Sequence, residues 1–214
     1  MSLPHIVILA GGQGQRLGHV RKADLRIGGR TLLGRVADAL GPSGVKMLAL
    51  GPVFAYPPAP TGFLAVRDLD TSLAGPLAGL AGAIAALQGM KIEKGLLVSV
   101  AVDTPFLPHN FVSRLQAGLH ATDAAYASWR DQPYPTNAIW RIEAVADLPR
   151  QVHEGTAPPS LRRLLEQMDA AAVDWSAEAD MDPFANVNTV ADLLTLARRL
   201  IGAPPSPVIH KRGN

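Results

Sequence analysis

The sequence predicts a single α/β domain with a mostly parallel central β-sheet and helices on its faces. Short strand-like runs alternate along the chain with apolar stripes at helical spacing, a pattern that favours parallel strand pairing. The run at residues 96–102 is almost entirely apolar on both faces, as expected for a buried central strand. No linker divides the 214 residues, so we expect one domain over residues 1–202 and a flexible tail over 203–214.

In the first half of the chain, an apolar run at residues 5–10 ends in glycines, which predicts a buried strand followed by a loop. A helix is expected after Pro76, because Pro suits a first helical turn and large apolar residues recur there at spacings of four and three. Gly79 and Gly82 permit this helix to pack closely on the sheet. The other expected elements are a helix near residues 31–40, strands near 46–51, 64–66 and 96–102, and a proline-rich loop at 56–60.

In the second half, a helix is expected from Pro108 to about residue 121. Two apolar runs at residues 124–129 and 138–142 predict a hairpin whose connection spans residues 130–135. Ser160 follows two prolines and suits a helix N-cap, which predicts a helix over residues 160–168. A strand near 171–174 and a closing helix near 190–200 complete the domain.

The composition excludes several classes of protein. Hydrophobic residues make up 48% of the chain and charged residues 18%, which excludes a disordered polyelectrolyte and a coiled coil. Because the chain has no cysteine, it forms no disulfide, thiolate metal site or cysteine nucleophile, which fits a cytoplasmic location. The six histidines are dispersed and no Gly-x-Ser-x-Gly elbow is present, so zinc and serine hydrolases are poorly supported.

Neither nucleic acid nor a membrane is an expected partner. The 20 Lys and Arg against 18 Asp and Glu leave a net charge of +2, and the basic residues are scattered, unlike the basic patch that duplex binding requires. Residues 71–90 carry no charge, but they are rich in Ala and Gly and contain Pro76. We therefore expect a tightly packed helix there and no membrane span.

The first strand leads into a glycine-rich loop with the features of an anion site. The loop reads Leu9-Ala10-Gly11-Gly12-Gln13-Gly14-Gln15-Arg16-Leu17-Gly18, and Lys22 follows it. It fits neither the dinucleotide fingerprint, which needs glycine at Leu17, nor the P-loop, which needs a Lys-Ser or Lys-Thr pair. Its backbone N–H groups can still bind a phosphate, with Arg16 and Lys22 balancing the charge. The alternative is a tight turn without a ligand.

Two aspartates are candidate ligands near the carboxyl ends of predicted strands. Asp103 directly follows the run at 96–102, where open α/β sheets bind ligands, and a lone carboxylate beside substrate phosphates suits Mg²⁺. The alternative is that Asp103 caps the turn before Pro105. Asp68 lies shortly before the helix that starts at Pro76 and can accept hydrogen bonds from a base or ribose, or lie in an exposed turn.

Asn186 and Asn188 stand ahead of the closing helix. Their carboxamides can donate and accept hydrogen bonds without adding charge, which suits a polar substrate. The alternative is that Asn188 or Thr189 caps that helix.

Taken in order, these motifs resemble the molybdenum cofactor guanylyltransferases. The resemblance runs from about residue 6 to residue 195, and its motifs are Leu9-Ala10-Gly11-Gly12 with Arg16, Gly18 and Lys22, then Gly75-Pro76-Leu77-Ala78-Gly79, Asp103-Thr104-Pro105, Pro135-Thr136 and Asn186-Val187-Asn188-Thr189. It implies a three-layer Rossmann-like nucleotidyltransferase fold. It also implies a Mg²⁺-dependent transfer of GMP from GTP to the terminal phosphate of molybdenum-loaded molybdopterin, with transient protein partners in cofactor delivery.

The resemblance implies a role for each matching residue. It assigns Leu9, Ala10, Gly11, Gly12 and Asp68 to the guanine nucleotide, Lys22 to its phosphates, Asp103 to the nucleotide and Mg²⁺, and Asn186 and Asn188 to the pterin side. Asp103, Lys22 and Arg16 would then act together in catalysis. The second glycine of Leu-Ala-Gly-Gly favours the guanylyl branch over the cytidylyl branch, which typically has Leu-Ala-Ala-Gly.

The chain also departs from the family pattern. Arg21 stands where an acidic residue is usual, His19 stands where glycine is common, and Asp70 competes with Asp68 for the nucleotide. Three alternatives therefore stay open: cytidylyl transfer to the same pterin, nucleotidyl transfer to a sugar phosphate, and a non-catalytic GTP-binding partner protein.

Overall fold

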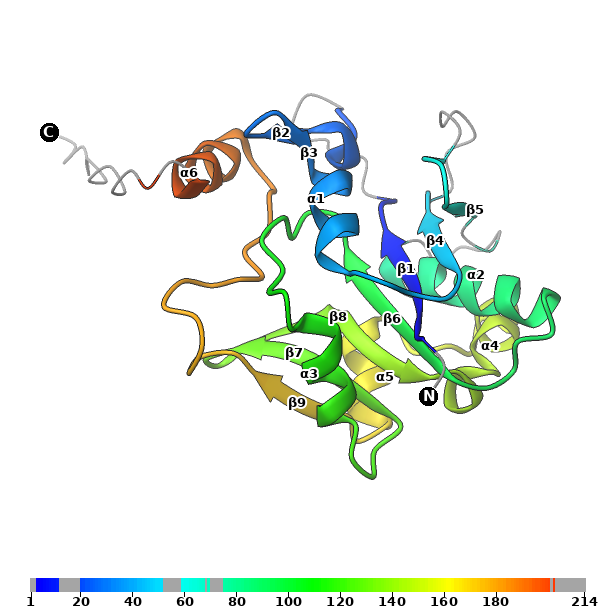
Figure 1. Ribbon diagram of the computed structural model, residues 1–214. Helices are drawn as coiled ribbons and strands as arrows, with labels where there is room; N and C mark the ends of the chain where they lie inside the picture. Colours follow the sequence, from blue (N-terminus) through cyan, green and yellow to red (C-terminus); the bar gives the residue numbers. More distant parts are fainter. Residues whose placement is uncertain are drawn as a thin grey trace, which may run out of the picture.

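A computed structural model describes residues 3–11, 20–51, 59–67, 69, 75–200 and 202. Within these ranges the chain forms a seven-stranded sheet in the order β5-β4-β1-β6-β8-β7-β9 (Figure 1). All its neighbouring strands are parallel except β8, which runs antiparallel to both β6 and β7. The strands are β1 (His5–Leu9), β4 (Lys46–Ala49), β5 (Leu64–Val66), β6 (Leu96–Ala101), β7 (Ala124–Trp129), β8 (Gln132–Arg141) and β9 (Ala171–Asp174).

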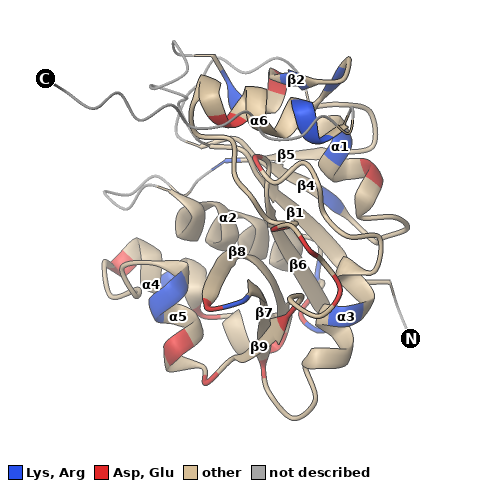
Figure 2. Cartoon of the chain, turned by 90° about the vertical axis from the view of Figure 1, so that its left-hand side faces the viewer, with Lys and Arg blue, Asp and Glu red and all other residues tan. Residues whose placement is uncertain are grey.

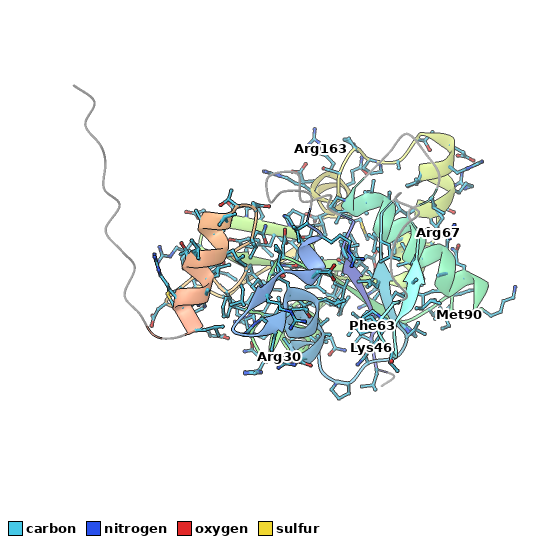
Figure 3. All side chains as sticks on the ribbon, turned by 90° about the horizontal axis from the view of Figure 1, so that it is seen from above. Arg30, Lys46, Phe63, Arg67, Met90 and Arg163 are labelled. Atoms are coloured by element: carbon cyan, nitrogen blue, oxygen red, sulfur yellow. The ribbon has the colours of Figure 1, made fainter. Side chains whose placement is uncertain are left out.

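Helices cover both faces of the sheet and produce three layers. One core lies between the sheet and α2 (Pro76–Gly89), α4 (Leu148–Glu154) and α5 (Leu161–Gln167). The other lies beneath α1 (Leu32–Ala39) and α3 (Phe111–Gly118). The view in Figure 3 accordingly shows Arg30, beside α1, and Arg163, on α5, on opposite sides of the sheet.

A third, smaller core lies beside this sandwich. There α6 (Val190–Leu200) packs on the two-stranded sheet of β2 (Arg26–Ile27) and β3 (Arg30–Thr31). The helices α1, α5 and α6 each carry a basic and an acidic segment (Figure 2). The helices of the described ranges include none with the length and apolar character needed to cross a membrane.

Most predicted elements are present, and β6 takes the predicted middle position in the sheet. The Ser160 side chain accepts a hydrogen bond from the Arg163 N–H at 3.3 Å, so the predicted N-cap is confirmed. The predicted close packing of the helix at Gly82 is also confirmed, because a Cβ there would lie 2.3 Å from the Arg67 carbonyl oxygen. The expected tail at 203–214 lies outside the described residues.

The predicted hairpin is wrong in one respect, because β8 starts at Gln132 and not at residue 138. Only its second part pairs with β6, whereas its first part pairs with β7 alone across a register shift at Tyr126 and Ala127. Pro133 and Pro135 therefore occupy a stretch with one free edge, where a missing N–H is tolerated. Three short elements, α4, β2 and β3, were not predicted, because they are too short to show a clear period.

The register of β1 brings the predicted site residues to one edge of the sheet. Leu9 is aligned with Ala49 of β4 on one side and with Ala101 of β6 on the other. Just beyond the ladder, the Val102 N–H donates to the Leu9 carbonyl at 3.1 Å. The loop after β1 and the turn after β6, which carries Asp103, therefore begin next to each other.

Candidate active site

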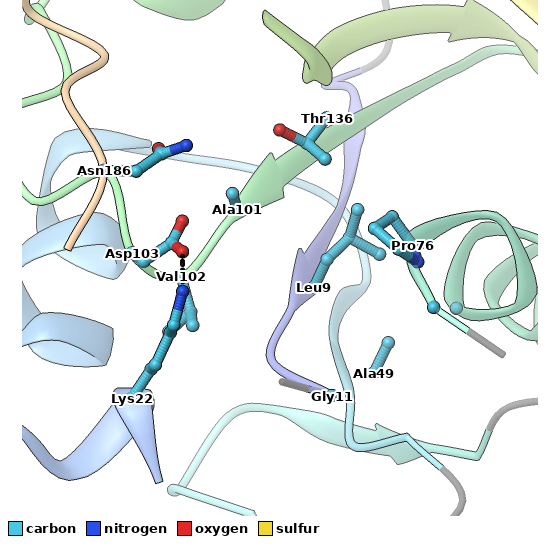
Figure 4. Close-up of a pocket in the computed structure, with 12 residues that line it drawn as sticks. Leu9, Gly11, Lys22, Ala49, Pro76, Ala101, Val102, Asp103, Thr136 and Asn186 are labelled. Atoms are coloured by element: carbon cyan, nitrogen blue, oxygen red, sulfur yellow. Dashed lines mark hydrogen bonds and ion pairs between the residues drawn. The ribbon is translucent and has the colours of Figure 1, made fainter. Parts of the chain in front are cut away.

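A pocket of about 260 Å³ opens at the carboxyl ends of β1, β4 and β6 (Figure 4). The first loop contributes Leu9 and Gly11, and the turn after β6 contributes Asp103. The opposite wall comes from the start of α2 and from Thr136 of β8. This is the position at which an open α/β sheet offers a crevice to a ligand.

Gly11 and Gly51 bring the loops after β1 and β4 into backbone contact. A Cβ on Gly11 would lie 2.9 Å from the Gly51 Cα, and a Cβ on Gly51 would lie equally close to the Gly11 Cα. Gly51 also has a φ of +78°, which favours glycine. Beside the pocket, the two loops therefore approach each other more closely than a side chain on either glycine would allow.

The charged groups of the pocket form one contact network. The Lys22 Nζ lies 2.5 Å from the Asp103 Oδ2 and donates to the Asn188 Oδ1 at 2.6 Å. The Lys22 and Asp103 side chains are only 16% and 14% exposed, so their attraction is less screened than at an open surface. The Asp103 carboxylate contacts Lys22, while the Thr104 hydroxyl secures the turn before Pro105 by donating to the Ala101 carbonyl at 2.7 Å.

The segment before α6 is attached to the same turn. The buried Val187 donates its N–H to the Asp103 carbonyl at 3.1 Å. Its neighbours Asn186 and Asn188 therefore stand close to Asp103, and Asn186 lines the pocket (Figure 4). A segment more than 80 residues further along the chain thus completes the site.

Thr189, rather than Asn188, caps α6. The Asp192 N–H donates to the Thr189 Oγ1 at 3.1 Å, and the Asp192 Oδ2 accepts from the N–H groups of Asn188 and Thr189 at 3.0 and 2.8 Å. Burial raises the pKa of Asp192, but these hydrogen bonds and the nearby Lys22 charge outweigh it, so the pKa lies below its usual value. This reciprocal arrangement leaves the Asn188 carboxamide available for Lys22.

The positive end of α2 forms part of the pocket wall. Gly75 has a φ of +107° and precedes Pro76 at the first helical turn. The leading N–H groups of a helix have no intrahelical acceptor and carry partial positive charge. Gly75, Pro76 and Gly79 line the pocket, so this positive end faces the same space as Lys22.

The structure brings most of the predicted site residues together. Leu9, Gly11, Lys22, Asp103 and Asn186 line the pocket, and Asn188 reaches it through Lys22. Ala10 is buried beside them, with its N–H on the Ala49 carbonyl at 2.8 Å. Gly12, Arg16, Asp68 and Asp70 lie outside the described residues.

Two residues near the pocket were not predicted, Gly51 and Asp192. Gly51 contacts Gly11 from another strand end, and no local pattern reveals such a contact. Asp192 stands three residues after Thr189, a spacing typical of a capping box, so that signal was present in the sequence.

Among the described residues that line the pocket, Asp103 is the carboxylate that could hold a cation. Among the described residues, no three His, Asp or Glu side chains form a metal cluster. A single carboxylate fits Mg²⁺, which keeps several waters and shares substrate phosphates, better than an ion that needs a closed protein cage.

Comparisons with known proteins agree with this geometry. Residues 6–173 match the family described as "MobA-like NTP transferase domain". The chain is 30% identical over 192 residues to a protein of Sinorhizobium fredii named molybdenum cofactor guanylyltransferase, and the match covers 87% of each protein.

Two crystal structures have a similar fold. Molybdopterin-guanine dinucleotide biosynthesis protein A of Archaeoglobus fulgidus superposes with a TM-score of 0.68 at 22% identity, covering 92% of this chain and 98% of that one. The 2-C-methyl-D-erythritol 4-phosphate cytidylyltransferase of Thermus thermophilus superposes with a TM-score of 0.65 at 19% identity, covering 95% and 100%. The predicted three-layer nucleotidyltransferase fold is thereby confirmed.

Proposed function

Because the chain belongs to the MobA-like NTP transferase family, we propose that it transfers GMP from GTP to the terminal phosphate of molybdenum-loaded molybdopterin. The products are the guanine dinucleotide cofactor and pyrophosphate. The observation that carries the proposal is the junction of Lys22, Asp103 and Asn188 beside the Gly11 loop. The name of the Sinorhizobium fredii relative supports the choice of nucleotide and acceptor.

The chemistry needs no protein nucleophile. An oxygen of the acceptor phosphate attacks the α-phosphorus of GTP in line, the new P–O bond forms, and the bond to the β-phosphate oxygen breaks, so that pyrophosphate leaves. The attacking phosphate is already an anion, so catalysis consists of positioning and charge neutralisation. The small, partly enclosed pocket serves the first need and its positive groups serve the second.

Each predicted residue has a place in this scheme. Leu9, Ala10, Gly11 and Gly12 bind the guanine nucleotide together with Asp68, while Lys22 and Arg16 neutralise the phosphates and the departing pyrophosphate. Lys22 lines the pocket, and the positive end of α2 lies opposite it. Asn186 and Asn188 bind on the side of the pterin.

Asp103 would hold Mg²⁺, which, when bound, neutralises the nucleotide's phosphate oxygens. The Asp103 carboxylate is paired with the Lys22 ammonium at 2.5 Å. The ammonium has three N–H donors, so it can bind a nucleotide phosphate while it keeps its contacts with Asp103 and Asn188, and the second Asp103 carboxylate oxygen would bind the cation. Lys22 and Asp103 then act on the same phosphate chain from two sides.

A pyrophosphate-release assay tests the proposal. GTP, CTP and ATP are each supplied with Mg²⁺, with and without molybdenum-loaded molybdopterin. We expect release only with GTP and the pterin together. Release with CTP instead would identify the cytidylyl alternative, and GTP binding without any release would identify a non-catalytic partner protein.

Replacement of Asp103 tests the metal assignment in the same assay. We expect Asp103→Asn to lower kcat by at least about 100-fold, the scale of losing one transition-state charge contact, with a smaller change in GTP affinity. Asp123→Asn is the matched control, because Asp123 is exposed and pairs only loosely with Arg141 at 3.8 Å. If Asp103→Asn lowered kcat by no more than a few-fold, the assignment of Asp103 to the metal would be contradicted.

The proposal also covers the protein partners and the location of the enzyme. Enzymes that finish a cofactor hand their product to other proteins, so transient protein partners in delivery are proposed. A cytoplasmic location is proposed because the chain has no cysteine, which fits a reducing compartment.

A further inference from the structure

We propose that Asp192, in the first turn of α6, is a positioning residue for the transfer reaction. Through the backbone of Asn188 it holds the Asn188 carboxamide on the Lys22 ammonium, and so keeps Lys22 beside Asp103. Asp192 is not among the described residues that line the pocket. The inference rests on the proposed function, since the reaction gives Lys22 its role.

The contacts that support this role form a continuous chain. The Asp192 Oδ2 accepts from the N–H groups of Asn188 at 3.0 Å and Thr189 at 2.8 Å. The Asn188 Oδ1 then accepts from the Lys22 Nζ at 2.6 Å, and the same Nζ lies 2.5 Å from the Asp103 Oδ2. Three hydrogen-bonding steps therefore connect the start of α6 to the candidate metal ligand.

The chain of contacts matters because the Asn188 side chain is exposed. An exposed carboxamide samples several rotamers, and holding one of them costs free energy. The Asn188 backbone is held on both sides, by Val187 on the Asp103 carbonyl at 3.1 Å and by the Asp192 carboxylate. With both attachments in place, its carboxamide starts from a backbone that already points toward Lys22.

The charge of Asp192 acts in the same direction. Its carboxylate and the Lys22 ammonium attract each other, and this attraction adds to that of Asp103. Lys22 is thus kept at the mouth of the pocket by two carboxylates and one carboxamide. The position of its charge is set before the nucleotide arrives, which is the arrangement that favours transition-state stabilisation.

A double-mutant cycle with Asp192→Ala and Asn188→Ala tests the proposal, with kcat and the KM for the nucleotide measured by pyrophosphate release. We expect Asp192→Ala alone to lower kcat about tenfold, the effect of one lost hydrogen bond. In the Asn188→Ala background the same change should cost less than about twofold, because residues that act through one another are not additive. Equal losses in both backgrounds would overturn the proposal.

Two further variants separate positioning from helix stability. Asp192→Asn keeps an acceptor oxygen for both N–H groups, so we expect it to restore kcat to within about threefold of the parent. Ser160→Ala removes the N-cap of α5, so it should lower the unfolding temperature without changing kcat. If Asp192→Ala resembled Ser160→Ala, Asp192 would be a helix cap only.

A failure of the inference about Asp192 can be distinguished from a failure of the proposed function. If the parent releases no pyrophosphate with any nucleotide, the proposed function fails. Crystal structures of the parent and of Asp192→Ala then decide the inference without any activity. We expect the contact between Lys22 Nζ and Asn188 Oδ1 in the parent and its loss in the variant; an unchanged contact would overturn the proposal.

Discussion

Replacing Gly51 with alanine tests whether backbone contact between two loops shapes the nucleotide pocket. The substitution has two costs. The φ of +78° at Gly51 costs an L-residue about 1–2 kcal/mol. The new Cβ would also lie 2.9 Å from the Gly11 Cα and 3.1 Å from its carbonyl oxygen, and such overpacking costs about 1–3 kcal/mol.

Gly29→Ala is the matched control. Gly29 has the same φ of +78°, but a Cβ there has no atom within 4 Å. We therefore expect Gly29→Ala to lose about 1–2 kcal/mol of unfolding free energy, which is the conformational cost alone. The urea midpoints of the parent and both variants give these losses.

The two variants should also differ in nucleotide binding. Displacing the Gly11 backbone alters the pocket that it lines, so we expect Gly51→Ala to raise the KM for GTP about tenfold, equivalent to about 1.4 kcal/mol. Gly29→Ala should leave it unchanged. Equal stability losses in the two variants would refute the argument from close approach, and an unchanged KM in Gly51→Ala would refute the link to the nucleotide.

Three other predictions concern pH, a buried amide and the metal. Burial lowers the pKa of His5, whose Nδ1 accepts from the Val45 N–H at 3.0 Å. The unfolded chain therefore binds more protons at this histidine than the folded chain does. The free energy of unfolding should fall as the pH drops through about 6.5. In urea titrations on both sides of that pH, His5→Asn should show a smaller drop than the parent; an equal drop would exclude His5. Asn137→Ala should lose about 1–3 kcal/mol in the same assay, because the Asn137 Oδ1 accepts from the buried Ala101 N–H at 3.0 Å; no loss would mean that this N–H finds another acceptor. Chelation of divalent cations should abolish pyrophosphate release and added Mg²⁺ should restore it, whereas full activity with chelator would argue against a metal role for Asp103.

The elements of the fold could largely be predicted because their signals are local. The limits of β7, β9 and α6 match the expected ranges. The Ser160 cap was equally local, because an N-cap acts within one helical turn. β8 was harder to delimit, since whether Pro133 is tolerated depends on which neighbouring strand leaves an edge free.

The candidate site could likewise be predicted only in part from the sequence. From the sequence alone, Asp103 could be placed at the end of a buried strand and Lys22 after a glycine loop, because both follow local patterns. Only the tertiary structure decided that these side chains meet, that Asn188 joins Lys22 from 166 residues away, and that Thr189 takes the cap and leaves Asn188 available. Contacts of this kind depend on strand order and register, with β6 beside β1 and Val187 hydrogen-bonded to Asp103, and no pattern within a short stretch of residues contains that information.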